Sequence, residues 1–298
     1  MDVQLILVPY DSGHRDVRMG HGPEYFAARG VAENLRVGER KIALERIEAQ
    51  CPFLTEISTS FELHRLLAQR VQAAQEHQVL PLILAGNCNS ALGTLAGIEG
   101  YPVGVIWFDA HGDFNTPETT TGGFLDGMAA ATATGRCWTT LIQSIPGFTA
   151  IPDERVLMVG VRQLDEREQV LLEQSQITLL KGEQIQEMRL HKVHKDLEQA
   201  LTVLNSRVQQ VYLHIDLDVL DTKVGRANSY AVPGGLTVEE MEQAITMIVQ
   251  RFKIAAIAFT AYDPSCDPEE NILRAGLRLM EHVVQEVEKT RLYDLKSA

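Results

Sequence analysis

The sequence has few cysteines, and their spacing excludes several classes of protein. The 298 residues contain four cysteines and no CxxC pair, so nothing supports a zinc finger or a thioredoxin-like redox motif. Four cysteines in a chain of this length do not indicate a disulfide scaffold either, and free thiols are typical of a reducing cytoplasm. We therefore expect a cytoplasmic protein. The cysteines are Cys51, Cys88, Cys137 and Cys266.

Long apolar runs and an excess of basic charge are also missing. No stretch approaches the roughly 20 apolar residues of a membrane span. The short apolar run at 3–8 has no basic flank and is too short for a signal peptide. The formal net charge of −13 repels a nucleic-acid backbone but attracts cationic substrates. These absences predict a soluble protein that binds neither membranes nor nucleic acids.

What the sequence does contain is an alternation of two patterns. Short apolar runs rich in β-branched residues indicate strands at 3–8, 79–84, 103–108, 155–161, 211–216 and 254–259. Amphipathic segments indicate helices at 61–77, 127–143, 190–208, 237–251 and 268–287. Most runs are apolar on both faces, as in a parallel sheet covered on each side. We expect one α/β domain over 1–298, with a doubly wound, mostly parallel sheet and helices on both faces.

Residues with reactive side chains follow four of the expected strands. Cys88 follows the second strand, Asp109 the third, the segment 162–165 the fourth and Asp216 the fifth. In an open α/β sheet, ligands bind beyond the carboxyl ends of the strands. The four loops are therefore expected to form one site.

The segment after the third strand carries the strongest chemical pattern. Asp109, His111 and Asp113 stand at i, i+2 and i+4, so an extended strand end would point all three side chains the same way. They are candidate metal ligands. The alternative is structural, with Asp109 capping a turn and His111 buried and hydrogen-bonded.

Asp216 and Asp218 form a second pair at the end of the fifth strand. Buried carboxylates without partners are costly, so such pairs usually hold a cation or line solvent. The alternative is a solvated strand end, which explains Asp221 better than the other two. Together the two motifs bring four carboxylates and one imidazole to one edge, where they would repel one another unless metal neutralised them. Two divalent ions roughly 3.5–4 Å apart would do so and would activate a bridging water.

These motifs also resemble those of a known family. DAHGDFNTPETTTGG resembles the arginase segment DAHxDxNTPxTTTSG, and HIDLDVLD is similar to SxDxDxxDP. The similarity extends over almost the whole chain through VPYDSGHRDVRMGHGP, LAGNCNSALGT, VGVRQLDERE and YAVPGGLT. The sequence is identified as a member of the arginase (ureohydrolase) family.

The resemblance implies an arginase-like fold, a homo-oligomer and hydrolysis of a guanidinium group, with release of urea and an amine such as ornithine. It implies two Mn²⁺ ions, bridged by Asp109 and Asp216. Asp113 would complete the shell of one ion, while His111 and Asp218 would complete that of the other. Oxygen-rich sites with one or two imidazoles suit Mn²⁺ on general grounds. Asp113 and Asp126 are the expected catalytic residues.

Two departures from the family fall at this chemistry. Cys88 stands where arginases have a metal-binding histidine, and a thiolate is a softer ligand that must lose its proton to bind. The alternative is a small buried residue beside a weakened or empty metal site. Asp126 stands where the family has a histidine thought to shuttle protons. A carboxylate with a raised pKa can do acid–base work, although Asp126 could instead cap a helix starting at Gly127.

Further departures fall where the substrate would bind. Gly122 and Phe124 replace the serine and asparagine that hold the α-carboxylate in arginases. The family glutamate that pairs with the guanidinium falls on Ala261, and Tyr230 replaces a nearby threonine. A guanidinium favours a carboxylate partner, which Asp126 or Glu118 could supply from another direction. The expected substrate-binding residues are Asn115, Thr121, Phe124, Asp165 and Tyr230.

Three functions remain open at this point. Some branches of the family act on arginine within peptides, and the altered amino-acid contacts favour this substrate. The second is hydrolysis of free arginine or another guanidino compound. The third is a metal-binding pseudoenzyme, against which the retained DAHxD and DxD ligands argue.

Overall fold

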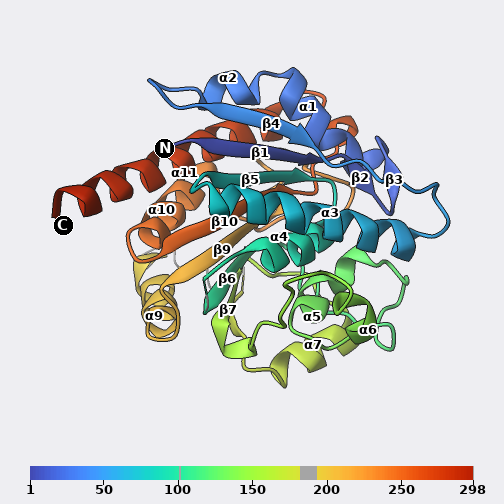
Figure 1. Cartoon of the computed structure of the whole chain (residues 1–298). Coiled ribbons are helices and arrows are strands. Elements are labelled where there is room, and N and C mark those ends of the chain that lie inside the picture. Colours follow the sequence, from blue (N-terminus) through green and yellow to red (C-terminus); the bar gives the residue numbers. More distant parts are fainter. Residues whose placement is uncertain (101, 182–192, 298) are drawn as a thin grey trace.

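A parallel sheet forms the centre of the computed structural model, which describes residues 1–100, 102–181 and 193–297 (Figure 1). Its strands are β1 (Val3–Val8), β4 (Ile42–Arg46), β5 (Leu80–Ala85), β6 (Val103–Phe108), β7 (Val156–Val159), β8 (Thr178–Leu180), β9 (Gln210–Asp216) and β10 (Lys253–Thr260). They lie in the order β4-β1-β5-β10-β9-β6-β7-β8, and each neighbouring pair is parallel. A small antiparallel pair, β2 (Tyr10–Asp11) and β3 (His14–Arg15), follows β1.

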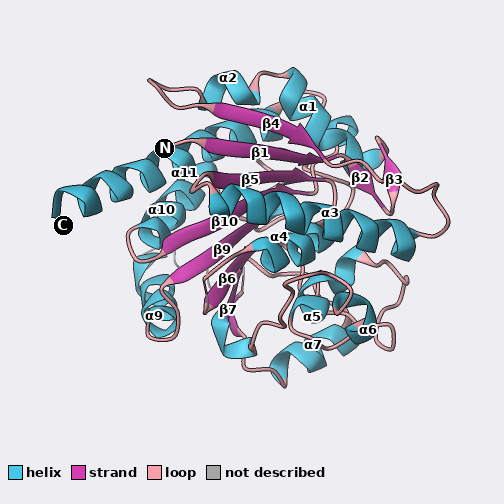
Figure 2. Ribbon diagram, in the orientation of Figure 1, coloured by secondary structure: helices cyan, strands magenta, loops and turns pink. Residues whose placement is uncertain are grey.

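Helices cover both faces of this sheet (Figure 2). One face packs against α2 (Val31–Leu35), α9 (Val193–Asn205), α10 (Val238–Val249) and α11 (Asn271–Ser297). The other packs against α3 (Glu56–Glu76), α4 (Ala91–Gly97), α5 (Ala129–Ala133) and α6 (Thr139–Ile142). The short helices α1 (Gly22–Ala28) and α7 (Glu166–Glu173) lie in loops that leave the sheet. The predicted doubly wound α/β fold is confirmed.

The strands are apolar on both faces because each face is buried under helices. In β1, Leu5 and Leu7 belong to one hydrophobic cluster, while Ile6 and Val8 belong to the other. This is the expected consequence of a two-residue side-chain period in a strand with no solvated face. Within the described ranges no helix is both long and apolar enough to cross a membrane.

The six predicted strands are present with small shifts at their ends, but two edge strands were missed. The side chains of β4 alternate irregularly between half-buried and exposed, and β8 has three residues, so neither gives a strong apolar run. The helix expected at 127–143 was wrong. It is divided into a short turn, η3 (Asp126–Met128), α5 and α6, because Gly135 and Trp138 adopt positive φ angles of 78° and 52°. Positions 190–192 of another expected helix lie outside the described residues.

The strand order of the sheet places the four central strands, β5, β10, β9 and β6, side by side with their carboxyl ends at one edge. Thr260 at the end of β10 pairs with Asp216 at the end of β9, and Phe108 of β6 pairs with Ile215. The loops that follow these strands therefore meet. In doubly wound sheets such an edge is where ligands bind.

Candidate active site

The buried end of the site consists of six potential metal ligands, which we call the ligand end: Cys88, Asp109, His111, Asp113, Asp216 and Asp218. Two groups within it have ligand atoms that all lie within 4.8 Å of one another. One group is Cys88, Asp109 and Asp216, and the other is Asp109, His111 and Asp218. Since Asp109 belongs to both, the arrangement has the form of two adjoining cation sites with a shared carboxylate.

The backbone brings these side chains together by turning, and not by extended strand alternation. β6 ends at Phe108, and Asp113 has a left-handed φ of 47°. Asp218 lies in the turn η5 (Leu217–Val219), where its N–H donates to Asp216 Oδ1 over 2.8 Å. The extended geometry expected from the i, i+2 and i+4 spacing was therefore wrong, although the side chains do converge.

The carboxylates of the ligand end are held firmly from the sheet side. Trp107 Nε1–H donates to Asp109 Oδ2 over 3.0 Å, and the His111 N–H donates to Asp109 Oδ1 over 2.7 Å. The Nδ1 of His111 lies 3.3 Å from Asp218 Oδ2.

Asp113 differs from these carboxylates, because its Oδ2 is buried and finds no hydrogen-bond partner among the described residues. A buried, unpartnered carboxylate oxygen is a feature that a bound cation explains.

The charges of the ligand end are unbalanced in the protein alone. Burial, reinforced by neighbouring carboxylates, raises the pKa of Asp113 and Asp216 well above the ordinary value, and it also raises that of Asp109. Burial opposes charge on His111 and Asp218 as well, but their mutual attraction raises the pKa of His111 and holds that of Asp218 at about 2. One imidazolium does not neutralise four clustered carboxyl groups. Divalent cations would, so the residues present fit such ions.

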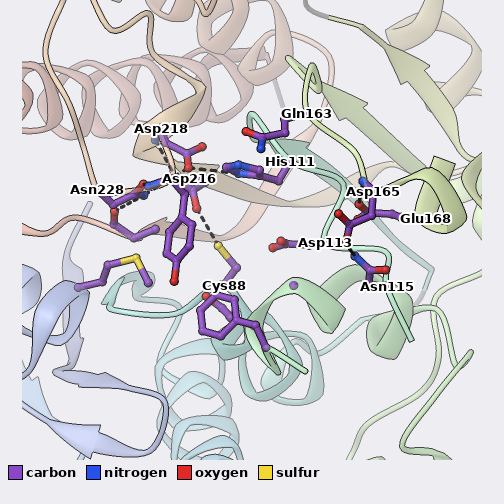
Figure 3. Close-up of a pocket in the computed structure, with 16 residues that line it drawn as sticks. Cys88, His111, Asp113, Asn115, Gln163, Asp165, Glu168, Asp216, Asp218 and Asn228 are labelled. Carbon is purple, nitrogen blue, oxygen red and sulfur yellow. Dashed lines mark hydrogen bonds and ion pairs between the residues drawn. The ribbon is translucent and has the colours of Figure 1, made fainter. Parts of the chain in front are cut away.

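Cys88 begins a short turn, η2 (Cys88–Ser90), directly beside the aspartates. Its sulfur lies 3.0 Å from Asp216 Oδ2 and 3.2 Å from Thr260 Oγ1, as Figure 3 shows for the aspartate contact. Burial, together with the charge of Asp216, raises the pKa of the Cys88 thiol well above its usual value. The sulfur is thus aimed at the Asp216 carboxylate, and a cation there would have to displace the thiol proton.

Asp126 does not cap a helix that follows it. It is the first residue of η3, and its carboxylate is directed to the loop after β5. There it accepts hydrogen bonds from Asn89 N–H over 2.7 Å and Asn87 Nδ2–H over 3.0 Å. Burial raises the pKa of Asp126 to about 7, against the opposing effect of the backbone N–H groups of Asn89 and Cys88. A carboxyl group with a pKa near neutrality suits proton transfer.

A cavity of about 150 Å³ opens above the ligand end. At its mouth Phe124 and Tyr230 stack, with ring centroids 5.6 Å apart and planes at 25°. We call the residues around this mouth the outer rim: Asn115, Thr121, Gly122, Phe124, Asp165 and Tyr230. Asn115 Nδ2–H and the Thr121 hydroxyl both donate to Asp165 Oδ2, over 3.2 and 3.3 Å. Thr121 and Gly122 are exposed and do not line the cavity.

The position of the family glutamate carries no polar side chain here. Ala261 lines the cavity with a left-handed φ of 61°, a conformation that disfavours alanine by about 1–2 kcal/mol. Its carbonyl accepts from Asn228 Nδ2–H over 2.9 Å, and the same amide donates to Asp218 Oδ2 over 3.3 Å. Of the two carboxylates considered for the guanidinium, Asp126 lines the cavity, whereas Glu118 is exposed and does not.

Some lining residues were missed from sequence. Glu168 accepts from the N–H groups of Phe114 and Asp165 over 2.8 and 3.1 Å, and its position three residues after Asp165 is a capping-box spacing that could have indicated it. Gly112 leaves room for it, because a Cβ there would lie 2.7 Å from Glu168 Oε1. Met19 and Gln163 also line the cavity. No sequence pattern marks these two, because folding alone brings their loops to the edge.

Two groups of potential metal-ligand side chains at the carboxyl edge of a doubly wound sheet place the protein in the class of α/β proteins with a candidate two-metal site. Comparison with known proteins makes this specific. The Arginase family model matches residues 1–285, and the chain belongs to the arginase family. It is a hydrolase of the C–N bonds of linear amidines.

Individual relatives agree over nearly the whole chain. The arginase of Bacillus caldovelox is 31% identical over 291 residues, covering 93% of this chain and 96% of its own length. The arginase of Bacillus subtilis is 30% identical and covers 95% and 97%. The crystal structure of Bacillus cereus arginase superposes with a TM-score of 0.85 at 27% identity, covering 95% of this chain and 98% of that one.

Proposed function

We propose that this protein hydrolyses the guanidinium group of arginine within a peptide, leaving an ornithine residue and releasing urea. The observation that carries the proposal is the contrast within one cavity. Its buried end concentrates carboxylates, which favours a cationic group, while Phe124 lines its outer part, where a free α-carboxylate would need a polar partner. Gly122, exposed two residues before Phe124, offers no side-chain donor either. A peptide presents a neutral amide at that place.

The ligand end is proposed to hold two Mn²⁺ ions. Cys88, Asp109, Asp113 and Asp216 would hold one, and Asp109, His111, Asp216 and Asp218 the other. Such ions, when bound, lower the pKa of water and polarise the group under attack. The fit rests on the shared Asp109, the unpartnered oxygen of Asp113 and the excess of buried negative charge.

Asp126 is proposed to move the proton. In the overall hydrolysis, the oxygen of water joins the guanidinium carbon, the bond from that carbon to the side-chain nitrogen breaks, and this nitrogen must gain a proton. Asp126 lines the cavity and is held by Asn87 and Asn89, so its carboxyl group is fixed where it can accept a proton and return it. Asp113 is also proposed to be a catalytic residue, because it would hold one of the metal ions beside the reacting carbon.

The outer rim is proposed to hold the peptide main chain. Asp165 already receives two side-chain hydrogen bonds, from Asn115 and Thr121, which lowers its need for a free ammonium group. Phe124 and Tyr230 form an aromatic surface on which neighbouring peptide residues can pack. The expected homo-oligomer, the cytoplasmic location and the single domain over 1–298 stay predictions.

A urea assay tests the reaction itself. We expect the purified protein, loaded with Mn²⁺, to release urea from an arginine-containing peptide, and we expect exhaustive chelation to abolish this release. Absence of urea from every guanidino substrate, with metal bound, would indicate the pseudoenzyme instead. The second candidate substrate is free arginine or another guanidino compound, which the retained Asn115 and Asp165 favour.

A further inference from the structure

The Cys88 sulfur is contacted from the sheet side by a chain of buried polar groups that the proposed reaction does not use. Thr260 Oγ1 lies 3.2 Å from Cys88 Sγ and 3.3 Å from His214 Nε2. His214 Nδ1 in turn lies 2.7 Å from the hydroxyl oxygen of Tyr212. Each of the four side chains is at most 2% exposed. A continuous hydrogen-bonded chain thus runs from Tyr212 to the sulfur.

The sheet register creates this chain. Tyr212, His214 and Asp216 alternate along β9, so their side chains share one face of the sheet. Thr260 of β10 pairs with Asp216 and joins the same face. On the same strand, the small residues Ala256 and Ala258 pair with Tyr212 and His214, which leaves room for the two rings.

Trp107 fixes the orientation of the imidazole. It pairs with His214 across β6 and β9, and the two rings stack with centroids 3.7 Å apart and planes at 20°. The same indole donates to Asp109 Oδ2. The imidazole can therefore not rotate freely away from Thr260, and its orientation is linked to that of a ligand-end carboxylate.

The chemistry of these groups gives the chain a direction. The two ring nitrogens of His214 face the hydroxyl groups of Tyr212 and Thr260, and a neutral imidazole has one nitrogen that donates and one that accepts. If the protonated phenol of Tyr212 donates to Nδ1, then Nε2–H donates to Thr260 Oγ1. The hydroxyl proton of Thr260 can then be donated to the sulfur over 3.2 Å, a shorter contact than the 3.5 Å to the Ile215 carbonyl oxygen. When a bound metal ion displaces the thiol proton of Cys88, the thiolate sulfur is a good acceptor for the Thr260 hydroxyl.

We infer that Thr260, directed by His214 and Tyr212, is a positioning residue that donates a hydrogen bond to the Cys88 sulfur and holds it as a metal ligand. The inference rests on the proposed assignment of Cys88 to the metal site. Hydrogen bonds behind a ligand orient it, and their removal typically costs about 10–100-fold in metal affinity.

The test uses full-length protein loaded with Co²⁺, because a thiolate bound to Co²⁺ gives a charge-transfer absorption band in the near ultraviolet. We expect this band in the native protein and not in Cys88→Ser. Thr260→Val removes the hydroxyl at nearly equal volume, and we expect about 10–100-fold weaker Co²⁺ binding and a band at longer wavelength. Thr260→Ser keeps the hydroxyl and should restore both. Tyr212→Phe should shift the band in the same direction by a smaller amount.

The outcomes separate the inference from the proposed function. A band that is unchanged in both Thr260→Val and Tyr212→Phe would overturn the inference while leaving Cys88 a ligand. A native protein without the band would overturn the ligand assignment and the inference together. If Thr260→Val does not fold, Tyr212→Phe decides alone. Failure to release urea from any guanidino substrate would overturn the proposed function and leave the shifted bands, and hence the inference, standing.

Discussion

The ligand end lies at the buried end of the cavity and the outer rim lies around its mouth, and the two regions are built differently. Asp109 and Asp216 of the ligand end are 1% and 4% exposed and follow directly from central strands. At the outer rim Tyr230 is 43% exposed, and a Cβ at Gly122 would meet nothing within 4 Å. A change in the ligand end disturbs the core, whereas the rim can change with little effect on the fold. If the proposed function is correct, we therefore expect mutations to separate the chemistry from the choice of substrate.

Breaking the ligand end should have the largest effect. We expect Asp109→Asn and Asp216→Asn each to lower kcat by about 10³-fold or more, because metal polarisation contributes several kcal/mol to such reactions. Metal analysis of the purified variants, together with urea release, checks this. Asp16→Asn, at an exposed position with no role in the site, is the matched control. Full activity in a metal-free protein would contradict the assignment.

Asp126 lines the same cavity but belongs to neither set, and its variants test whether it transfers the proton. We expect Asp126→Asn to lower kcat by about 10²–10⁴-fold with a small change in KM, since the amide cannot take up the proton. Asp126→His should retain a larger share of the activity than Asp126→Asn. Steady-state kinetics at matched metal content measures both. Equal activities of Asp126→Asn and the native enzyme would remove Asp126 from catalysis.

Rebuilding the outer rim should change the substrate without changing the chemistry. We expect the double variant Gly122→Ser, Phe124→Asn to shift the ratio of kcat/KM toward free arginine by about 10²–10⁴-fold, because it restores two charged hydrogen bonds that contribute about 1.5–3 kcal/mol each. Metal content should stay at the native level. The control is Phe53→Asn, which changes an exposed aromatic residue outside the cavity. A ratio that does not move would show that these positions do not read the α-carboxylate.

The smallest effect is expected from the aromatic pair at the mouth. Tyr230→Leu removes the stacking on Phe124, and we expect a two- to tenfold loss in kcat/KM for peptide substrate, in line with about 0.5–1.5 kcal/mol for an aromatic contact. Free arginine should be nearly unaffected. Comparing the two substrates on one variant makes the test internal. Equal losses for both would place Tyr230 in general support of the cavity.

The central strands and the clustering of the ligand end could be predicted from the sequence because each strand and each ligand motif lies in a short contiguous segment. Asp109, His111 and Asp113 stand together after one strand, and an apolar run marks each central strand. By contrast, the hydrogen bond between Asp126 and Asn89 joins residues that are 37 positions apart, and no local pattern predicts it.

The hydrogen-bonded chain behind Cys88 was missed for the same reason, because its members are far apart in the sequence. The register that sets His214 against Trp107 depends on which strands become neighbours, so the chain behind Cys88 is invisible in the sequence. We expected a long helix at 127–143 because the apolar residues of this segment recur with a helical period. The positive φ angles of Gly135 and Trp138 interrupt the helix there.

The most direct test of the account is one comparison of kcat/KM on the Mn²⁺-loaded native protein, with urea as the readout. The substrates are free arginine, agmatine, an arginine blocked at both ends and an arginine-containing peptide. The account predicts that the peptide and the blocked arginine exceed free arginine by about tenfold or more, since they place no charged carboxylate against Phe124. Agmatine, which lacks the carboxylate but also the flanking residues, should fall between them. If free arginine exceeds the peptide by tenfold or more, the outer rim binds a free amino acid and the proposed substrate is wrong.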